Sequence, residues 1–164
     1  MTSSAQVLVV DDEPLIRQSL RGALQQEGFA AELAGSGAEA WERFRRDRPD
    51  IVLLDLMLGD TDGLKLLKRM KQEAPDTKII IVTAHGSIQS AVAAMRQEAY
   101  DFIKKPFDLA EITATVSNAA RTSALEHRVE YLAQRERRGR TGSSRSPRAS
   151  SGWSRRGTTR SSSR

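Results

Sequence analysis

Residues 50–60 read Asp-Ile-Val-Leu-Leu-Asp-Leu-Met-Leu-Gly-Asp, and this stretch decides the fold. The four consecutive apolar residues at 51–54 are too few for a helix, and turn-forming residues flank them. Such a run is typical of a strand buried on both faces of a parallel sheet. The strand ends in Asp55, at the carboxyl end, where open α/β sheets place their ligands. A carboxylate in this position either caps the following loop or takes part in chemistry.

Short apolar runs and helical patterns alternate five times between residues 7 and 122. The predicted strands occupy residues 7–10, 29–34, 50–55, 78–83 and 100–104. A helical pattern follows each strand, and these patterns begin at Pro14, Ser36, Asp62, Ile88 and Asp108. Proline suits the first turn of a helix, and Ser and Asp side chains cap helix N-termini. The alternation predicts an α/β fold, a doubly wound parallel sheet with helices on both faces.

The formal net charge of +5 averages two unlike segments. Residues 1–132 hold 16 Lys and Arg against 20 Asp and Glu, a net charge of −4. Residues 133–164 hold 10 Arg against one Glu, a net charge of +9. The basic character of the whole chain therefore says nothing about the partners of its folded part.

Composition excludes several classes of site. The chain has no cysteine, so disulfides and thiolate metal sites are excluded. No run of 18 apolar residues exists, and the N-terminus lacks the basic-then-apolar pattern of a signal peptide. We therefore expect a cytoplasmic protein without membrane contact.

Polar side chains collect where the predicted strands end. The strand ends carry three carboxylates, a hydroxyl and an ammonium group, from Asp11, Asp12, Asp55, Thr83 and Lys105. Because the carboxyl ends of parallel strands meet at one edge of the sheet, these groups should converge. Three carboxylates close together repel one another unless a cation lies among them. Oxygen ligands suit a hard divalent ion that keeps several waters, so we expect Mg²⁺ as the cofactor.

The chemistry that this arrangement permits is phosphoryl transfer to a carboxylate. Asp55 is the predicted nucleophile and forms an acyl phosphate. Mg²⁺ held by Asp11 and Asp12 would neutralise the phosphoryl oxygens, and Lys105 would add positive charge on the opposite side. Thr83 can donate a hydrogen bond to a phosphoryl oxygen.

The constellation resembles the receiver domain of two-component response regulators, over roughly residues 5–122. The residues that carry the resemblance are Val-Asp-Asp-Glu at 10–13, Asp55 after its apolar strand, Thr-Ala at 83–84 and Lys-Pro-Phe at 105–107. The resemblance implies a five-stranded, flavodoxin-like parallel sheet with strand order 2-1-3-4-5. It also implies Asp55 as the phosphoacceptor, Asp12 as a direct magnesium ligand, and Asp11 as a ligand mostly through water. The carboxylate of Asp55 and the backbone carbonyl of Met57 complete the implied metal site.

The same resemblance implies a conformational switch. Thr83 and Phe102 match the switch pair of the family, in which the hydroxyl turns toward the phosphoryl group and the aromatic ring follows inward. The Lys105–Pro106 peptide bond is expected to be cis.

Residues 83–95 and 99–107 look like the nitrogen-regulation subclass of transcriptional activators. One departure is Glu98, where that subclass usually has Gly. If the backbone is left-handed there, a residue other than Gly costs up to about 1 kcal/mol.

The implied function is a phosphorylation-dependent signalling switch that receives its phosphoryl group from a sensor histidine kinase. It is not expected to be an enzyme beyond weak self-phosphorylation from small donors and autodephosphorylation. One alternative is a nucleic-acid-binding protein that acts through the arginine-rich tail. A phosphohydrolase is a third interpretation, but it needs an acid or base near Asp55 and the strand ends offer none.

The predicted organisation has four parts. Residues 1–4 are a disordered N-terminus, 5–122 the receiver domain, 123–138 a helical extension, and 139–164 a disordered Arg/Ser/Gly-rich tail. Within the extension, an apolar seam with 4-then-3 spacing is formed by Leu125, Val129 and Leu132. The seam either leans on the domain's own surface or pairs with another helix, which makes a homodimer possible.

The tail has an unusual composition. Residues 139–164 contain seven Arg without one Lys, and no Ile, Leu or Val. This residue set is typical of GC-rich codons read out of frame, so the tail is either a real basic arm or a shifted reading. The ATPase and DNA-binding domains of the subclass do not fit after residue 132, and no G-x-x-x-x-G-K-[ST] motif occurs.

Overall fold

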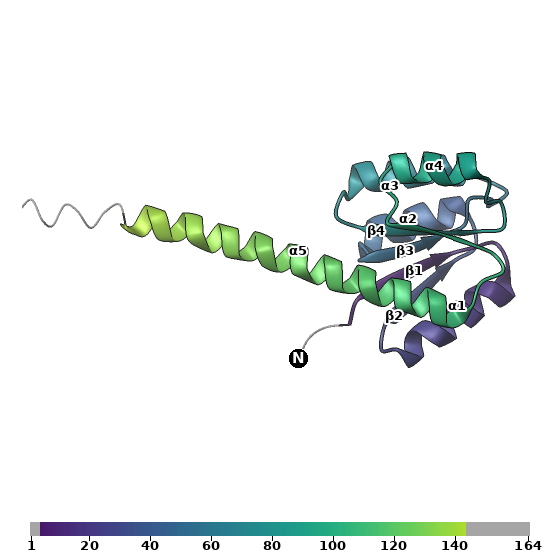
Figure 1. The fold of residues 1–164 in the computed structure, drawn as a ribbon, viewed down its shortest axis with the longest axis horizontal. Coiled ribbons are helices and arrows are strands. Elements are labelled where there is room, and N and C mark those ends of the chain that lie inside the picture. Colours follow the sequence, from purple (N-terminus) through teal and green to yellow (C-terminus); the bar gives the residue numbers. More distant parts are fainter. Residues whose placement is uncertain (1–3, 144–164) are drawn as a thin grey trace, which may run out of the picture. The chain divides into compact units, whose positions relative to one another are not determined.

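The computed structural model describes residues 4–143, with side chains described to residue 139 (Figure 1). The predictions for residues 1–3 and 144–164 lie outside the described residues. The chain divides into two compact units, Met1–Ser123 and Ala124–Arg164.

A five-stranded parallel sheet with the order β2-β1-β3-β4-β5 forms the centre of the first unit (Figure 1). Its strands are β1 (Gln6–Val10), β2 (Ala30–Ala34), β3 (Ile51–Leu54), β4 (Lys78–Thr83) and β5 (Asp101–Lys104). The helices are α1 (Pro14–Gln26), α2 (Gly37–Asp47), α3 (Gly63–Glu73), α4 (Ile88–Arg96) and α5 (Leu109–Ser143). The predicted alternation, the parallel sheet and the strand order implied by the resemblance are confirmed.

The apolar run of β3 lies at the middle of the sheet, and all four of its residues are at most 1% exposed. Val52 and Leu54 pack into a core cluster with side chains from α2, α3 and α4. Ile51 and Leu53 pack into a second cluster with side chains from α1 and the beginning of α5. Each fully buried Leu or Ile contributes about 1.5–3 kcal/mol, which is why this stretch determines the fold.

Helix N-termini form where the capping residues predict them. The Ser36 side chain accepts a hydrogen bond from the amide of Glu39, at 3.1 Å. Glu39 returns a bond to the preceding turn, because its Oε1 accepts from the amide of Gly35 at 2.7 Å. Asp62 and Asp108 accept hydrogen bonds from the first turns of α3 and α5. These contacts satisfy amides that a helix leaves without intrahelical partners.

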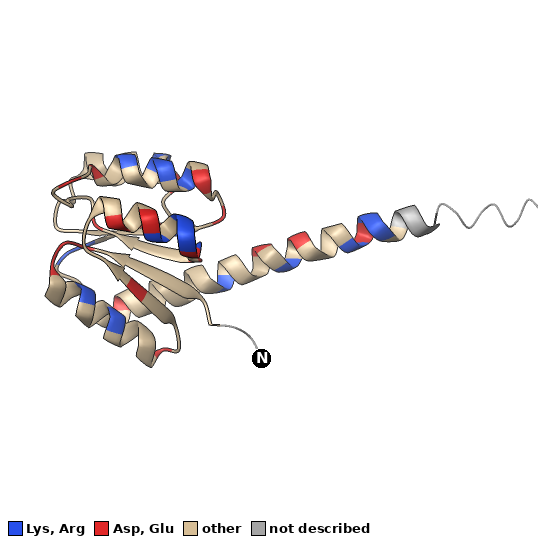
Figure 2. Ribbon diagram, turned by 180° about the vertical axis from the view of Figure 1, so that it is seen from behind, with Lys and Arg blue, Asp and Glu red and all other residues tan. Residues whose placement is uncertain are grey.

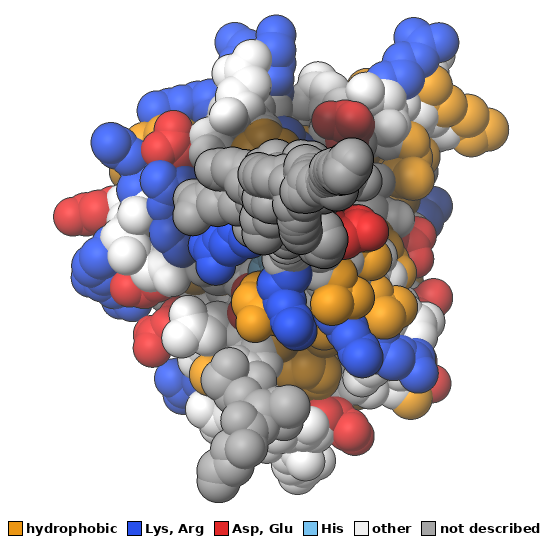
Figure 3. Space-filling view, turned by 90° about the vertical axis from the view of Figure 1, so that its left-hand side faces the viewer, with side chains coloured by type: hydrophobic (Ala, Val, Ile, Leu, Met, Phe, Trp, Pro, Cys, Tyr) orange, Lys and Arg blue, Asp and Glu red, His pale blue; other side chains and the backbone are white. Residues whose placement is uncertain are grey.

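The α4 segment differs from the other helices of the first unit. Ala94 is its only buried residue, whereas Ile88, Val92 and Met95 are 83%, 44% and 48% exposed. Figure 3 shows how hydrophobic side chains reach the molecular surface between charged ones. The helical spacing thus predicted α4 correctly, but most of its apolar face is not in the core. Glu98, just after the helix, has a left-handed φ of +68°, so the predicted strain is present.

The α5 helix ends at Ser143, beyond the predicted end of the ordered chain near residue 138. In the second unit, Leu125, Val129 and Leu132 are 60%, 66% and 49% exposed. Acidic and basic residues alternate along this part of the helix (Figure 2). No helix within the described residues is both long and apolar enough to cross a membrane.

Candidate functional site

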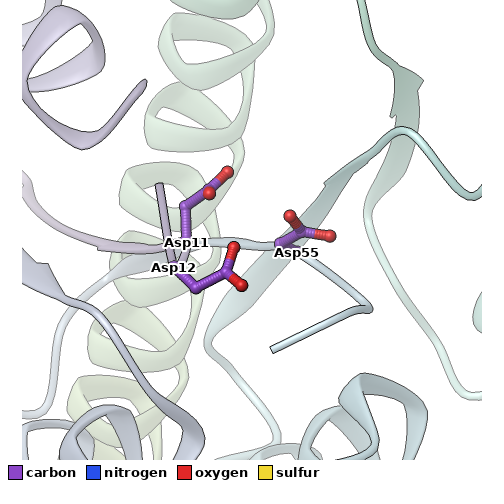
Figure 4. A group of neighbouring side chains, drawn as sticks. All are labelled: Asp11, Asp12 and Asp55. Carbon is purple, nitrogen blue, oxygen red and sulfur yellow. The ribbon is translucent and has the colours of Figure 1, made fainter. Parts of the chain in front are cut away.

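The carboxyl edge of the sheet brings the predicted site residues together. Val10 of β1 pairs with Leu54 of β3, so Asp11 and Asp55, which follow them, emerge side by side. Figure 4 shows the Asp12 carboxylate turned toward Asp55. One carboxylate oxygen from each of the three lies within 4.8 Å of those of the other two. Three converging carboxylate oxygens suit a hard divalent cation, so this donor set fits Mg²⁺.

Lys105 joins the two buried carboxylates. Its Nζ lies 2.6 Å from Oδ2 of Asp11 and 2.9 Å from Oδ2 of Asp55. The side chains of the three residues are 9%, 3% and 6% exposed. Burial alone lowers the pKa of Lys105, but its hydrogen bonds to the two carboxylates and their negative charges outweigh burial and raise the pKa above its ordinary value. The ammonium group therefore stays charged at neutral pH.

Thr83 occupies the other side of Asp55. Its hydroxyl donates to Oδ1 of Asp55 at 2.8 Å and accepts from the amide of His85 at 3.2 Å. The amide of Met57 also donates to Oδ1 of Asp55, at 3.1 Å. Asp55 thus has a hydrogen-bond donor on each carboxylate oxygen. The predicted metal contact of the Met57 carbonyl stays a prediction.

The expected switch pair lies across the β4–α4 loop. The Thr83 hydroxyl already faces Asp55, as its 2.8 Å hydrogen bond shows. Phe102 is half-buried and packs against the core cluster beneath α4. A Cβ at Gly86 would lie 3.2 Å from Cε1 of Phe102, so the ring rests against this loop. The Lys105–Pro106 peptide is cis, as predicted.

Sequence patterns assigned no role to three residues that contact the site or the loops around it. Glu13 Oε1 lies 3.9 Å from Nζ of Lys105. Arg17 donates from NH1 to the backbone carbonyl of Asp11 at 2.7 Å. Asp60 accepts hydrogen bonds from the first amides of α2. Glu13 belongs to the Val-Asp-Asp-Glu motif at 10–13, which carried the family resemblance but gave this residue no role, and no pattern marked Arg17 or Asp60.

With this geometry established, comparison with known proteins identifies the family. Residues 7–117 match the family model described as "Response regulator receiver domain". The chain belongs to the response regulator receiver domain family. Its carboxylates at the sheet edge therefore lie in a domain of the type that the sequence motifs predicted.

Curated relatives agree with the predicted subclass. The regulatory protein AtoC of Escherichia coli is 35% identical over 134 residues, which cover 82% of this chain and 29% of AtoC. The nitrogen assimilation regulatory protein NtrX of Azorhizobium caulinodans is 37% identical over 130 residues, 78% of this chain and 29% of NtrX. This chain thus spans less than a third of the length of these two relatives.

Solved structures have the same fold. NtrX from Brucella abortus, in complex with ADP, superposes with a TM-score of 0.74 and 37% identity, over 79% of this chain and 30% of that one. A CheY-like receiver domain protein from Methanospirillum hungatei has a TM-score of 0.73 and 26% identity, over 76% of this chain and 99% of that one.

Proposed function

We propose that this receiver domain is a phosphorylation-dependent switch that accepts a phosphoryl group from a sensor histidine kinase on Asp55. The observation that carries the proposal is the environment of this carboxylate. It lies at the sheet edge between the Lys105 ammonium and the Thr83 hydroxyl, beside two further carboxylates. Such a site places both a nucleophile and balancing charge where phosphoryl transfer needs them.

In the transfer, an oxygen of Asp55 forms a bond to phosphorus. The bond between phosphorus and the donor's imidazole nitrogen breaks, and its electron pair stays on the imidazole. Lys105 and Thr83 already lie within hydrogen-bond distance of the Asp55 carboxylate, so they can bind the oxygens of the arriving phosphoryl group. When bound, Mg²⁺ would neutralise charge on those oxygens, held by Asp11, Asp12, Asp55 and the carbonyl of Met57.

Turnover as a phosphohydrolase is not favoured by the groups around Asp55. Among the described residues, its side-chain hydrogen bonds come from an ammonium, a hydroxyl and a backbone amide. A charged ammonium cannot accept a proton, and the Thr83 hydroxyl is engaged with Asp55. None of these groups is a general base for water, and we assign the neighbouring carboxylates of Asp11 and Asp12 to the proposed metal site. We therefore propose no more than weak self-phosphorylation from small donors and slow autodephosphorylation.

The output that we propose is a change at the surface of α4 and β5. Thr83 precedes the β4–α4 loop, and Phe102 of β5 rests against the same loop at Gly86. A phosphoryl group on Asp55 would compete for the Thr83 hydroxyl and pull the loop toward the site. The exposed apolar residues of α4, Ile88, Val92 and Met95, offer a partner protein a contact surface that this shift alters.

We also propose that the switch acts in the cytoplasm and that the α5 seam supports a homodimer. The seam residues Leu125, Val129 and Leu132 are all about half exposed or more, so a second copy could bury them. Sedimentation equilibrium of wild type and Val129→Lys would show a dimer that the charged side chain weakens. Equal monomer fractions in the two proteins would contradict the dimer.

The experiment that tests the switch is labelling by radioactive acetyl phosphate with Mg²⁺ present. Asp55→Asn should abolish the label, because the amide cannot attack phosphorus, while the circular dichroism spectrum stays unchanged. Asp50→Asn, which alters a carboxylate that accepts from Gln6 elsewhere on the sheet, is the matched control and should label normally. Undiminished labelling of Asp55→Asn would disprove the assignment.

A further inference from the structure

Residues 34–38, which join the end of β2 to the first residues of α2 and are here called the β2–α2 turn, contact both of the loops that carry the site carboxylates. On one side it meets the β1–α1 loop, where the amide of Asp11 donates to the carbonyl of Ala34 at 3.1 Å. Arg17, bound to the Asp11 carbonyl, also lies against the turn, because a Cβ at Gly35 would be 2.9 Å from its NH1. The turn is therefore tied to the loop that holds two of the carboxylates.

On its other side, the turn meets the β3–α3 loop through Asp60. The two carboxylate oxygens of Asp60 accept from the amides of Gly37 and Ala38, at 2.9 and 3.1 Å. Helix N-termini leave such amides without intrahelical partners and favour negative charge. The bonds, first of all that from Gly37, hold the pKa of Asp60 below its ordinary value. Asp60 thus stays charged and bound at neutral pH.

Shape adds to this electrostatic contact. A Cβ at position 37 would overlap the side chain of Thr61, the residue after Asp60. Only glycine leaves room for Thr61 to sit against the start of α2. The Asp60 carboxylate and the packing of Thr61 therefore hold the β3–α3 loop against the start of α2.

The rest of the β3–α3 loop is rigid enough to couple the position of Asp60 to that of Met57. Gly59 has a left-handed φ of +79°, and the amide of Asp60 donates to the carbonyl of Leu58 at 2.8 Å, which closes a very short turn. Met57 forms an isolated antiparallel bridge with Asp62. A displacement of Asp60 would therefore displace Met57, whose amide is bonded to the phosphoacceptor carboxylate.

We propose that Asp60 is a positioning residue: by fastening the β3–α3 loop to the start of α2, it sets the spacing of the two carboxylate-bearing loops and so the affinity of the site for Mg²⁺. The inference rests on the proposed magnesium site. Asp60 does not bind the metal itself, since its carboxylate is occupied by α2. Removing the Asp60 hydrogen bonds to α2 leaves every proposed ligand in the chain but makes the distances between these ligands more variable.

The experiment is a Mg²⁺ titration followed by calorimetry and by amide chemical shifts, without any phosphodonor. Asp60→Ala should raise the dissociation constant by about tenfold, as loss of a residue that orients ligands does. Asp60→Asn keeps one acceptor oxygen and should fall between the alanine variant and wild type. Asp50→Ala is the matched control, because the Asp50 carboxylate also accepts a backbone amide, that of Gln6 at 2.9 Å.

A second pair of variants tests the steric contact. Gly37→Ala should weaken Mg²⁺ binding several-fold, because the new Cβ pushes Thr61 and its loop away. The double variant Gly37→Ala, Thr61→Gly removes the overlap and should restore affinity toward the wild-type value. A purely structural role of the contact would not give this recovery of metal affinity.

The outcomes separate this inference from the proposed function. If wild type binds Mg²⁺ and Asp60→Ala binds it no more weakly than Asp50→Ala, the positioning role is disproved and the magnesium site stands. If wild type binds no Mg²⁺, both proposals fail. A tenfold weakening confined to Asp60→Ala, with the intermediate Asn variant and the steric rescue, supports the role of Asp60.

Discussion

The two halves of the sheet are built differently. Around β1 and β3, the strands are buried on both faces. The β3–α3 loop is bound to the start of α2, and Lys105 joins Asp11 to Asp55. Around α4 and β5, one helix residue is buried, Glu98 is left-handed, and the apolar face of α4 is exposed. The proposed nucleophile and the proposed metal ligands lie in the first half, whereas the surface that we propose to signal lies in the second. Phosphoryl transfer needs fixed geometry, and a switch needs a segment that costs little to move.

The largest expected effect is a difference in stability between the two halves of the sheet. Leu53→Ala, in the middle of β3 and 1% exposed, should lower the free energy of unfolding by about 2–5 kcal/mol. Ile88→Ala, on α4 and 83% exposed, should change it by no more than about 0.5 kcal/mol. Urea unfolding followed by circular dichroism measures both. Equal losses would mean that α4 is as well anchored as the strand.

A smaller effect is expected on the coupling between the two halves. Thr83→Ala removes the hydroxyl that lies 2.8 Å from Asp55, but leaves the nucleophile and the carboxylates in place. The variant should still accept phosphate, while amide shifts across residues 84–107 on phosphorylation become much smaller than in wild type. Shifts of wild-type size in the labelled variant would show that the signal does not pass through Thr83.

The lifetime of the acyl phosphate should depend on Met57. Met57 is 53% exposed, and its amide donates to Asp55, so we expect its side chain to flank the path of an attacking water. Methionine has no group to orient that water. Met57→Asn should change the hydrolysis rate several-fold, measured as loss of label after the donor is removed. A rate that does not respond to this residue places the water path elsewhere.

The smallest expected effect is on the local stability of α4. Glu98→Gly relieves a left-handed φ of +68° and should stabilise the end of α4 by up to about 1 kcal/mol. Hydrogen exchange of the α4 amides should then slow by up to about fivefold, since about 1.4 kcal/mol corresponds to tenfold. Leu53 amide exchange serves as the reference in the same spectra. Unchanged α4 exchange would mean that the strain is not released by local opening.

Local sequence determined most of the scaffold of this protein. The apolar run before Asp55 predicted the central strand, and Ser36 and Asp62 marked where helices begin, because side-chain oxygens cap amides within three residues. Polar residues at successive strand ends predicted the candidate site, since parallel strands carry their carboxyl ends to one edge. The strand order and the roles of Thr83 and Phe102 came instead from resemblance to the receiver family.

Tertiary structure decided which atoms of these parts contact one another. Lys105 contacts Asp11 at a sequence separation of 94 residues, and Asp60 binds the amide of Gly37 at a separation of 23. The helical spacing of α4 also did not predict that its apolar face is exposed. Periodicity identifies an apolar face but does not show whether a neighbouring element covers it. Sequence periodicity reflects interactions between residues that are a few positions apart in the chain. Contacts between loops, and the exposure of a helix face, depend on how the whole sheet packs.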